Sequence, residues 1–187
     1  MFPAVFLDRD GVLIQNRSDY VRDWSQVSVF PDAPAALSSL RSAGYKIVII
    51  TNQSAIGRGL ITLESAEEIN RRLIEYLRRD GGHIDAVYMC PHQPQDACDC
   101  RKPKPGLLLR AAEELSLNLH GSWLIGDAWS DLLAGRAASV HQTILVKTGL
   151  GNGQLLQTRP DELKSYLVVE NVADAAKAIT SEHHKPA

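Results

Sequence analysis

The sequence predicts an α/β fold, a Rossmann-like three-layer sandwich with a mainly parallel sheet. Three observations lead to this prediction. Short apolar, β-branched runs of strand length recur along the chain, amphipathic helical patterns lie between them, and the two alternate throughout. Strands that are joined through helices run parallel, because the right-handed crossover returns the chain to the end of the sheet at which the previous strand began. The helices then cover both faces.

Six apolar runs have the length and residue types of strands. Polar or charged residues bound them, as is typical of strands that are buried on both faces of a parallel sheet. The predicted strands cover residues 4–7, 47–50, 84–89, 123–125, 143–146 and 166–169.

Five helical patterns separate these strands. Asp32 and Thr62 are the predicted N-caps of the first two helices, since a side-chain oxygen at that position accepts a free backbone N–H. Gly44 and the Gly81-Gly82 pair are the predicted stops, because glycine readily adopts the left-handed backbone. The remaining helices are predicted from Pro105-Gly106 through Leu117 and over residues 130–139 and 172–179.

Length and composition predict one domain over residues 1–180, with a frayed tail over 181–187 and a solvated His183-His184 pair. The chain has 187 residues and is 44% hydrophobic, which suffices for one core. A net charge of -2, from 20 basic and 22 acidic residues, favours neither nucleic acid nor an anionic membrane. No apolar stretch approaches the roughly 18 residues of a membrane span, and no signal-peptide pattern opens the chain. A cytoplasmic monomer is expected.

Polar clusters directly follow four of the predicted strands. These clusters are Asp8 with Asp10, Thr51-Asn52-Gln53, Cys90-Pro91-His92 and Gly126-Asp127. In open parallel sheets the ligand site lies beyond the carboxyl ends of the strands. The sequence therefore predicts that residues more than a hundred positions apart meet at one edge of the sheet.

The run Asp8-Arg9-Asp10-Gly11 is the first candidate for chemistry. After an extended strand Asp8 and Asp10 lie on the same side of the chain, and Gly11 permits a turn away from the site. Two carboxylates so close repel one another unless they share a cation. An Asx-type turn is the alternative for these residues alone. A calcium-binding EF-hand loop is excluded, because Val12 and Leu13 occupy positions that need an oxygen ligand and a glycine.

Further charged groups complete a predicted magnesium site. Asp127 ends one strand and Asp131 follows one helical turn later, so with Asp8 and Asp10 they form an oxygen-rich cluster that suits Mg²⁺. Asp131 alone could serve only the helix N-terminus. Lys102 adds positive charge and Thr51 a hydroxyl. Together these residues include the nucleophile, proton donor, metal site and fixed charge that phosphoryl transfer requires.

A second metal site is predicted in the loop after the third cluster. Cys90, His92, Cys98 and Cys100 offer three thiolates and one imidazole, which is a full set for a closed tetrahedral Zn²⁺ site of structural type. A set of reduced cysteines is the alternative, and a disulfide is disfavoured in a cytoplasmic protein. Clamping this loop would position the adjacent Arg101-Lys102 pair at the phosphate end of the sheet.

The motifs Asp8-x-Asp10-Gly11, Thr51-Asn52-Gln53, Lys102 and Gly126-Asp127-x-x-x-Asp131 resemble the four ordered motifs of haloacid dehalogenase superfamily phosphatases, over residues 4 to about 150. The resemblance implies that Asp8 attacks phosphorus, and that Asp10 protonates the leaving oxygen and then activates water. It implies that Asp8, the Asp10 carbonyl and Asp127 hold Mg²⁺. Thr51 and Lys102 would stabilise the phosphoryl oxygens, with Asp131 in support.

The run from Cys90 to Gly106 resembles the small zinc-containing branch of this superfamily, which includes heptose bisphosphate and histidinol-phosphate phosphatases. The run from Thr51 to Gly59 is more similar to enzymes that remove the 7-phosphate of D-glycero-D-manno-heptose 1,7-bisphosphate during lipopolysaccharide precursor synthesis. Some relatives have Lys where this chain has Ala128. The contacts that the resemblance implies to the sugar or its second phosphate are Asn16, Arg17, Ser18, Asp19, Tyr20, Asn52, Gln53, Ser54 and Arg101.

Spacing leaves no room for a cap domain. About 40 residues separate the first motif from Thr51 and about 50 separate Thr51 from Lys102, and one helix, one strand and short loops fill each interval. Specificity for a small phosphorylated sugar must then come from the loops at 14–25, 54–60 and 90–102. A histidinol-phosphate phosphatase is the alternative enzyme. A non-catalytic zinc-stabilised phosphosugar-binding module is the alternative of another class, and it would need no nucleophile.

Overall fold

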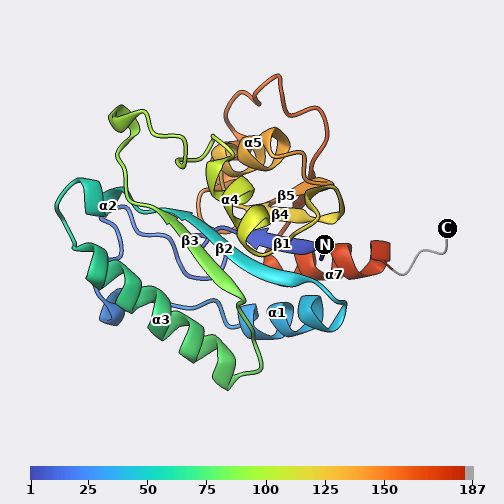
Figure 1. The fold of residues 1–187 in the computed structure, drawn as a ribbon, viewed down its shortest axis with the longest axis horizontal. Helices are drawn as coiled ribbons and strands as arrows, with labels where there is room; N and C mark the ends of the chain where they lie inside the picture. Colours follow the sequence, from blue (N-terminus) through green and yellow to red (C-terminus); the bar gives the residue numbers. More distant parts are fainter. Residues whose placement is uncertain (184–187) are drawn as a thin grey trace.

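A computed structural model describes residues 1–183 of the chain, in which a six-stranded parallel sheet is covered by helices on both faces (Figure 1). The predicted α/β class with a parallel sheet is confirmed. The order in the sheet is β3-β2-β1-β4-β5-β6, so β1 lies between β2 and β4. The strands are β1 (Ala4–Leu7), β2 (Lys46–Asn52), β3 (Ala86–Cys90), β4 (Trp123–Gly126), β5 (Gln142–Val146) and β6 (Leu167–Val169).

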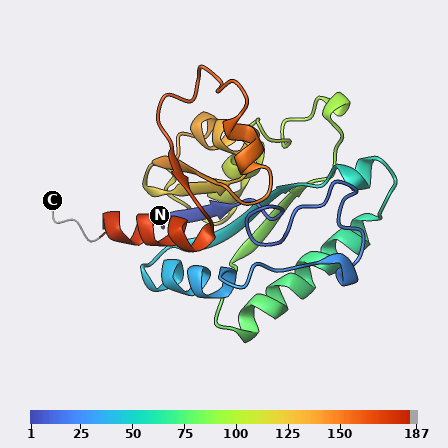
Figure 2. The ribbon, with the colours of Figure 1, turned by 180° about the vertical axis from the view of Figure 1, so that it is seen from behind.

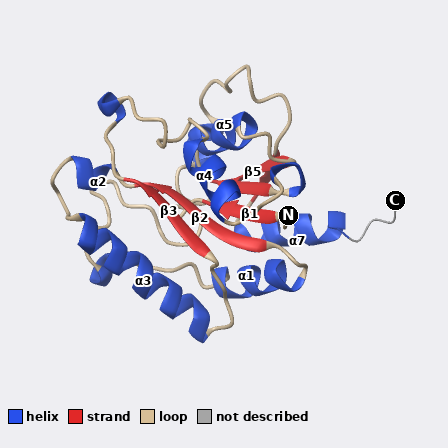
Figure 3. Cartoon of the chain, in the orientation of Figure 1, coloured by secondary structure: helices blue, strands red, loops and turns tan. Residues whose placement is uncertain are grey.

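Two groups of helices form the outer layers and lie on either side of the red strands in Figure 3. One face packs against α1 (Ala33–Ser42), α3 (Leu63–Arg79) and α7 (Val172–His183). The other face packs against α4 (Gly106–Glu114) and α5 (Trp129–Ala137). Figure 2 shows α7 beside α1, so the end of the described chain closes the first layer.

The central strand β1 explains why its sequence is a continuous apolar run. Val5 and Leu7 point into the core under α1, α3 and α7, whereas Ala4 and Phe6 point into the core under α4 and α5. All four residues are fully buried. A strand with both faces covered loses the polar alternation of a half-exposed strand, and its burial on both sides fixes its register.

Shorter elements connect the layers. Two of them, α2 (Ser54–Gly57) and α6 (Gly151–Leu155), are single-turn helices that the sequence analysis did not predict, because one turn gives no helical periodicity. Three 3₁₀ turns lie at η1 (Trp24–Gln26), η2 (Pro94–Asp96) and η3 (Leu119–Gly121). No helix among residues 1–183 is long and apolar enough to cross a membrane.

The helix caps were predicted with mixed success. Thr62 caps α3, since its hydroxyl accepts the Ser65 N–H at 3.1 Å. Gly44 and Gly81 adopt the left-handed backbone at φ 89° and 85°, as predicted. The Asp32 cap was wrong: its backbone is already in the helical region and its side chain makes no capping hydrogen bond.

Several element ends differ from the prediction, most of them by one or two residues, and three of these differences stand out. The helix from Gly106 ends at Glu114 rather than at residue 117, since Ser116 turns at φ 52° and Leu117 pairs with Phe2. Strand β3 starts at Ala86, directly after Asp85, whose carboxylate takes the place of a backbone acceptor for the Ile47 N–H at 2.8 Å. Helix α7 extends to residue 183, within the predicted tail, and residues 184–187 of that tail, including His184, lie outside the described residues.

Candidate active site

The strand order brings the predicted polar clusters together. Because β1 lies between β2 and β4, the residues that follow it face those at the ends of both neighbours. They line a cavity of about 190 Å³ at the carboxyl edge of the sheet. The predicted catalytic and metal-binding residues that line it are Asp8, Asp10, Thr51, Lys102, Asp127 and Asp131.

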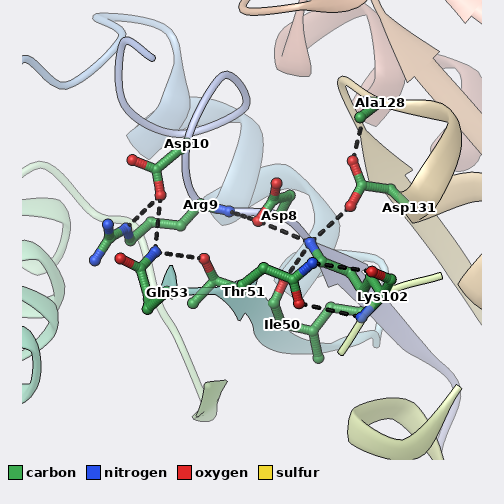
Figure 4. Close-up of polar contacts among 10 residues, drawn as sticks. Asp8, Arg9, Asp10, Ile50, Thr51, Gln53, Lys102, Ala128 and Asp131 are labelled. Atoms are coloured by element: carbon green, nitrogen blue, oxygen red, sulfur yellow. Dashed lines mark hydrogen bonds and ion pairs between the residues drawn. The ribbon is translucent and has the colours of Figure 1, made fainter. Parts of the chain in front are cut away.

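Lys102 lies at the centre of the site and is only 3% exposed. Its Nζ lies 2.9 Å from Asp8 Oδ1 and 2.6 Å from Asp131 Oδ1, and it donates to the Ile50 carbonyl at 2.9 Å (Figure 4). Asn52 holds the lysine's backbone from both sides, because its amide donates to the Lys102 carbonyl and accepts the Lys102 N–H, each at 3.1 Å. Asn52 lines the cavity, and the structure adds an anchoring role.

Asp131 holds this lysine and the start of α5 at once. While Oδ1 contacts Lys102, Oδ2 accepts the Ala128 N–H at 3.0 Å, just before the helix begins (Figure 4). The carboxylate is also favoured by the positive end of the helix dipole. Asp131 therefore contacts both the helix N-terminus and Lys102, and its supporting role in catalysis stays a prediction.

The loop after β5 holds the Asp127 carboxylate, and the sequence analysis did not predict this contact. Its Oδ2 accepts the Leu150 N–H at 2.8 Å. Glycines allow the close approach: a Cβ at Gly11 would lie 1.9 Å from Asp127 Oδ2, and one at Gly149 would lie 2.1 Å from it. Gly149 also has φ +58°. The Gly149-Leu150-Gly151 spacing after a strand was the available signal.

The charges in this cluster do not balance. Burial, with the nearby charge of Asp131, raises the pKa of Asp8 to about 7 against the pull of Lys102. Burial, with the charges of Asp131 and Asp8, raises the pKa of Asp127 to about 8. Burial lowers the pKa of Lys102, but Asp131 and Asp8 outweigh this effect and raise it, so the lysine stays charged. One ammonium thus faces three carboxylates.

The donor set of this cluster fits a hard divalent cation. Asp8, Asp127 and Asp131 each have a carboxylate oxygen within 4.8 Å of the others. Mg²⁺ prefers oxygen ligands and is commonly held by one or two carboxylates together with phosphate oxygens. A cation here would supply the positive charge that the cluster lacks.

We expect the stability of the magnesium-free protein to fall as the pH rises from about 4 to about 8. The folded-state pKa values of Asp8 and Asp127, about 7 and 8, exceed the ordinary value of 3.8. The folded chain therefore holds protons that the unfolded chain has released, and it loses that advantage as they dissociate. Thermal unfolding across this pH range measures the slope. Asp127→Asn should flatten it, and an equal slope in the variant would contradict the assignment.

The Asp10 carboxylate is held separately from the metal-type cluster. Its Oδ2 accepts the Arg9 Nε at 2.9 Å and the Gln53 Nε2 at 3.1 Å (Figure 4). Gln53 also donates to the Thr51 hydroxyl at 2.8 Å. The expectations that Asp10 binds metal through its backbone carbonyl and transfers a proton through its carboxylate both remain predictions.

The predicted substrate contacts divide into two groups. Asn16, Arg17, Tyr20, Asn52 and Gln53 line the cavity. Four others lie outside its lining, namely Ser18, Asp19, Ser54 and Arg101. Val21, from the predicted 14–25 loop, and Ala128, where some relatives have Lys, also line the cavity, and the sequence analysis missed Ser130 and Leu150.

Two of the residues outside the lining support their neighbours. The Asp19 carboxylate accepts both Nε and Nη2 of Arg17, each at 3.1 Å. Arg101 donates from Nη1 to the Ser54 hydroxyl at 2.6 Å and to the His92 carbonyl at 3.1 Å. This second pair of contacts fastens the cysteine-containing loop to α2.

The four predicted zinc ligands converge as one cluster. Cys100 Sγ lies 3.2 Å from Cys90 Sγ and 3.4 Å from Cys98 Sγ, and Cys90 Sγ lies 3.7 Å from Cys98 Sγ. His92 Nδ1 lies 3.2 Å from Cys100 Sγ and 3.6 Å from Cys90 Sγ. Tetrahedral sulfur ligands about 2.3 Å from Zn²⁺ would lie roughly 3.8 Å apart. The cluster is close to that geometry and could hold a metal.

The electrostatics of the cluster also favour a cation. Burial raises the pKa of Cys100 to about 12, and the neighbouring sulfurs of Cys90 and Cys98 add to the shift. Three adjacent sulfurs cannot all ionise without a shared positive charge. The backbone around them is tightly packed, since the Gly57 N–H donates to the Pro91 carbonyl at 2.9 Å, and a Cβ at Gly106 would lie 2.2 Å from the Asp99 carbonyl oxygen.

Comparison with known proteins gives consistent relatives. Residues 99–175 match the family model described as HAD-hydrolase-like. The D-glycero-beta-D-manno-heptose-1,7-bisphosphate 7-phosphatase of Pseudomonas aeruginosa is 38% identical over 175 residues, covering 94% of this chain and 96% of the relative. The enzyme of the same name from Helicobacter pylori strain 26695 is 41% identical over 144 residues, covering 76% and 83%.

A solved structure agrees with these relatives. The D,D-heptose 1,7-bisphosphate phosphatase from B. bronchiseptica, complexed with magnesium and phosphate, superimposes with a TM-score of 0.89 at 34% identity. The match covers 96% of this chain and 99% of that one. The similarity therefore extends over the whole fold and not only over the motifs.

Proposed function

The chain belongs to the haloacid dehalogenase-like hydrolases, and from that membership we propose that it is a phosphatase that removes the 7-phosphate of D-glycero-D-manno-heptose 1,7-bisphosphate. One observation carries the proposal. Asp8, Asp10, Lys102 and Asp127 meet in a single cavity, in a chain whose whole length resembles enzymes of that name. A binding module would need no nucleophile there.

The first half of the proposed reaction transfers the phosphoryl group to Asp8. Asp8 Oδ1 is held by the Arg9 N–H at 2.7 Å and by Lys102, which orients the carboxylate. Oδ2 attacks phosphorus, an O–P bond forms, and the bond from phosphorus to the sugar oxygen breaks. Asp10 gives its proton to that oxygen as it leaves.

The second half releases phosphate. Asp10, now a carboxylate, removes a proton from a water molecule whose oxygen attacks phosphorus, and the bond to Asp8 breaks. Lys102 and the Thr51 hydroxyl stabilise the phosphoryl oxygens through both halves. Asp8, Asp127 and the Asp10 carbonyl would hold Mg²⁺, which supplies positive charge to the transferring group. Asp131 acts by holding Lys102.

We assign Zn²⁺ to the cluster of Cys90, His92, Cys98 and Cys100. Three sulfurs and an imidazole nitrogen in a tight loop suit a closed structural site, with no open position for catalysis. The loop continues directly into Arg101 and Lys102, so the metal would support the catalytic lysine. Loss of the zinc should therefore lower the activity, because it would loosen the loop that holds Lys102.

We expect about one Zn²⁺ per chain in the purified protein, and its loss in the double variant Cys98→Ser and Cys100→Ser. Hydroxyl groups replace two of the four donors, and a structural zinc site does not survive on the remaining two. Metal analysis by mass spectrometry measures the stoichiometry. Ser130→Ala, far from the cluster in sequence, is the matched control and should keep its zinc. Unchanged zinc in the double variant would remove the metal from this loop.

The second phosphate of the substrate is assigned to the loop around Arg17. Arg17 and Lys102 are cations that line the cavity. Lys102 is buried between Asp8 and Asp131, whereas the pair of Arg17 with Asp19 is exposed and can be exchanged for a phosphate. Asn16 and Tyr20 lie in the same lining and offer polar groups to a sugar. Ala128 adds no charge, so Arg17 carries the recognition of the distal phosphate in this chain.

Comparing kcat/KM for both anomers of heptose 1,7-bisphosphate with that for histidinol phosphate tests the assignment of substrate. We expect at least one anomer of the bisphosphate to be preferred, because Arg17 can pair with its second phosphate. A preference for histidinol phosphate would establish the alternative enzyme. Turnover of neither would favour the non-catalytic module.

Three further predictions concern the whole protein. We propose that residues 1–180 form one domain without a cap, that the protein is a monomer, and that it acts in the cytoplasm on small phosphorylated sugars. Light scattering coupled to gel filtration would measure the oligomeric state, and a dimer would contradict the second of these.

A further inference from the structure

Arg9 is a buried charge that neither the motifs nor the proposed reaction uses. It is the largest of the fully buried side chains, with 1% of its surface exposed. Its guanidinium donates from Nε to Asp10 Oδ2 at 2.9 Å and from Nη1 to Asn70 Oδ1 at 2.9 Å. Arg9 does not line the active-site cavity. Burying a guanidinium is costly unless its partners are well placed, so these contacts need a reason.

Asn70 fixes the far end of the arginine. It lies on α3, is 6% exposed, and stands 61 positions from Arg9 in the chain. The guanidinium is planar and its donors are rigidly spaced, so holding Nη1 also sets the position of Nε. Helix α3, through Asn70, therefore determines the position of the Arg9 Nε that donates to Asp10.

The two oxygens of Asp10 have different surroundings. Oδ2 accepts from both Arg9 and Gln53 (Figure 4), whereas Oδ1 accepts no hydrogen bond from residues 1–183. The Asp10 side chain is 22% exposed and lines the cavity, in contrast to the enclosed arginine. Oδ2 is thus held by Arg9 and Gln53, and Oδ1 is left for a substrate.

We propose that Arg9, anchored by Asn70, is a positioning residue that fixes the Asp10 carboxylate for proton transfer to the leaving oxygen. The inference rests on the proposed function, because it requires Asp10 to be the acid. Arg9 touches no substrate. It acts by preventing rotation of Asp10, so that Oδ1 meets the sugar oxygen as the bond to phosphorus breaks.

The dependence of rate on the leaving group tests this inference. Phenyl phosphate needs protonation of its leaving oxygen far more than p-nitrophenyl phosphate does. In Arg9→Met we expect kcat/KM to fall about 100-fold for phenyl phosphate and about tenfold or less for p-nitrophenyl phosphate, in line with the usual contribution of a general acid. Equal losses on the two esters, or no loss, would overturn the proposal.

Two milder variants, Arg9→Lys and Asn70→Leu, separate positioning from folding. Arg9→Lys keeps the charge but cannot hold Asp10 and Asn70 with one fork, so it should lie between wild type and Arg9→Met. Asn70→Leu leaves Arg9 in place but frees its far end, and should produce the same selective loss to a smaller extent. If Arg9→Met does not fold, an equal loss on both esters in Asn70→Leu overturns the proposal. Arg71→Met, on the exposed face of α3, should change neither rate.

Asp10→Asn separates this inference from the proposed function. If that variant shows the selective loss and Arg9→Met does not, the positioning role fails while the mechanism stands. If Asp10→Asn hydrolyses both esters as well as wild type does, the acid role itself fails, and the inference falls with it.

Discussion

Asp8→Asn is expected to abolish turnover, lowering kcat by roughly 10⁴-fold or more, while the fold is retained. The amide nitrogen or oxygen of asparagine is a poor nucleophile toward phosphorus, so no aspartyl phosphate forms. Losses of this size are typical when a covalent nucleophile is removed. Steady-state kinetics on the heptose bisphosphate measures the effect.

The surroundings of Asp8 explain why the variant should fold. Its Oδ1 accepts from the Arg9 N–H and contacts Lys102, and an asparagine oxygen can replace it. Burial already raises the pKa of Asp8 to about 7, so the neutral amide suits the site at least as well as the charge does. Asp161→Asn, at an exposed carboxylate outside the cavity lining, is the control and should leave turnover intact. Undiminished hydrolysis in Asp8→Asn would exclude the proposed mechanism.

Lys102→Met is expected to reduce both activity and stability. In the proposed reaction its ammonium stabilises the phosphoryl oxygens, and losing one such group costs roughly 10²- to 10³-fold in kcat. The fold also suffers, because the buried carboxylates of Asp8 and Asp131 lose their shared partner. Removing one member of a buried ion pair costs about 3–5 kcal/mol. Steady-state kinetics and thermal unfolding measure the two effects.

Two further variants identify the source of each loss. Lys104→Met changes an exposed lysine two residues along the same loop, which pairs with Asp99, and should leave both quantities near wild type. Adding Asp131→Asn to Lys102→Met removes one unpaired carboxylate, so it should recover part of the stability and none of the activity. Recovery of activity in that double variant would show that Lys102 serves only the fold.

Much of the site could be predicted from the sequence because its residues lie where buried strands end. Asp8, Thr51 and Asp127 each follow or close an apolar run, and parallel strands end at one edge of the sheet. The cysteine cluster could be predicted equally well, since its four residues lie within one run of eleven: Cys90, His92, Cys98 and Cys100. In both cases local spacing carries the information.

The pairing of distant side chains could not be predicted in this way. Nothing in the spacing of the chain connects Arg9 with Asn70, or Asp127 with the Leu150 N–H, because those contacts depend on how α3 and the loop after β5 pack. The same holds for the predicted substrate contacts. Arg101 donates a hydrogen bond to Ser54 and does not line the cavity, whereas Ser130 and Leu150, which were not predicted, do line it.

The sequence by itself determined the α/β class, the edge of the sheet that bears the site and the residue types available for chemistry. Hydrophobic periodicity and the placement of glycines involve only a few neighbouring residues, so helices, strands and turns can be predicted from them without the tertiary structure. Only the tertiary structure decided which oxygen of Asp8 and of Asp10 is held and which accepts no hydrogen bond from residues 1–183, because hydrogen bonds are directional and depend on positions fixed by long-range packing. The chemistry is encoded in the motifs, and its orientation is set by the packed fold around them.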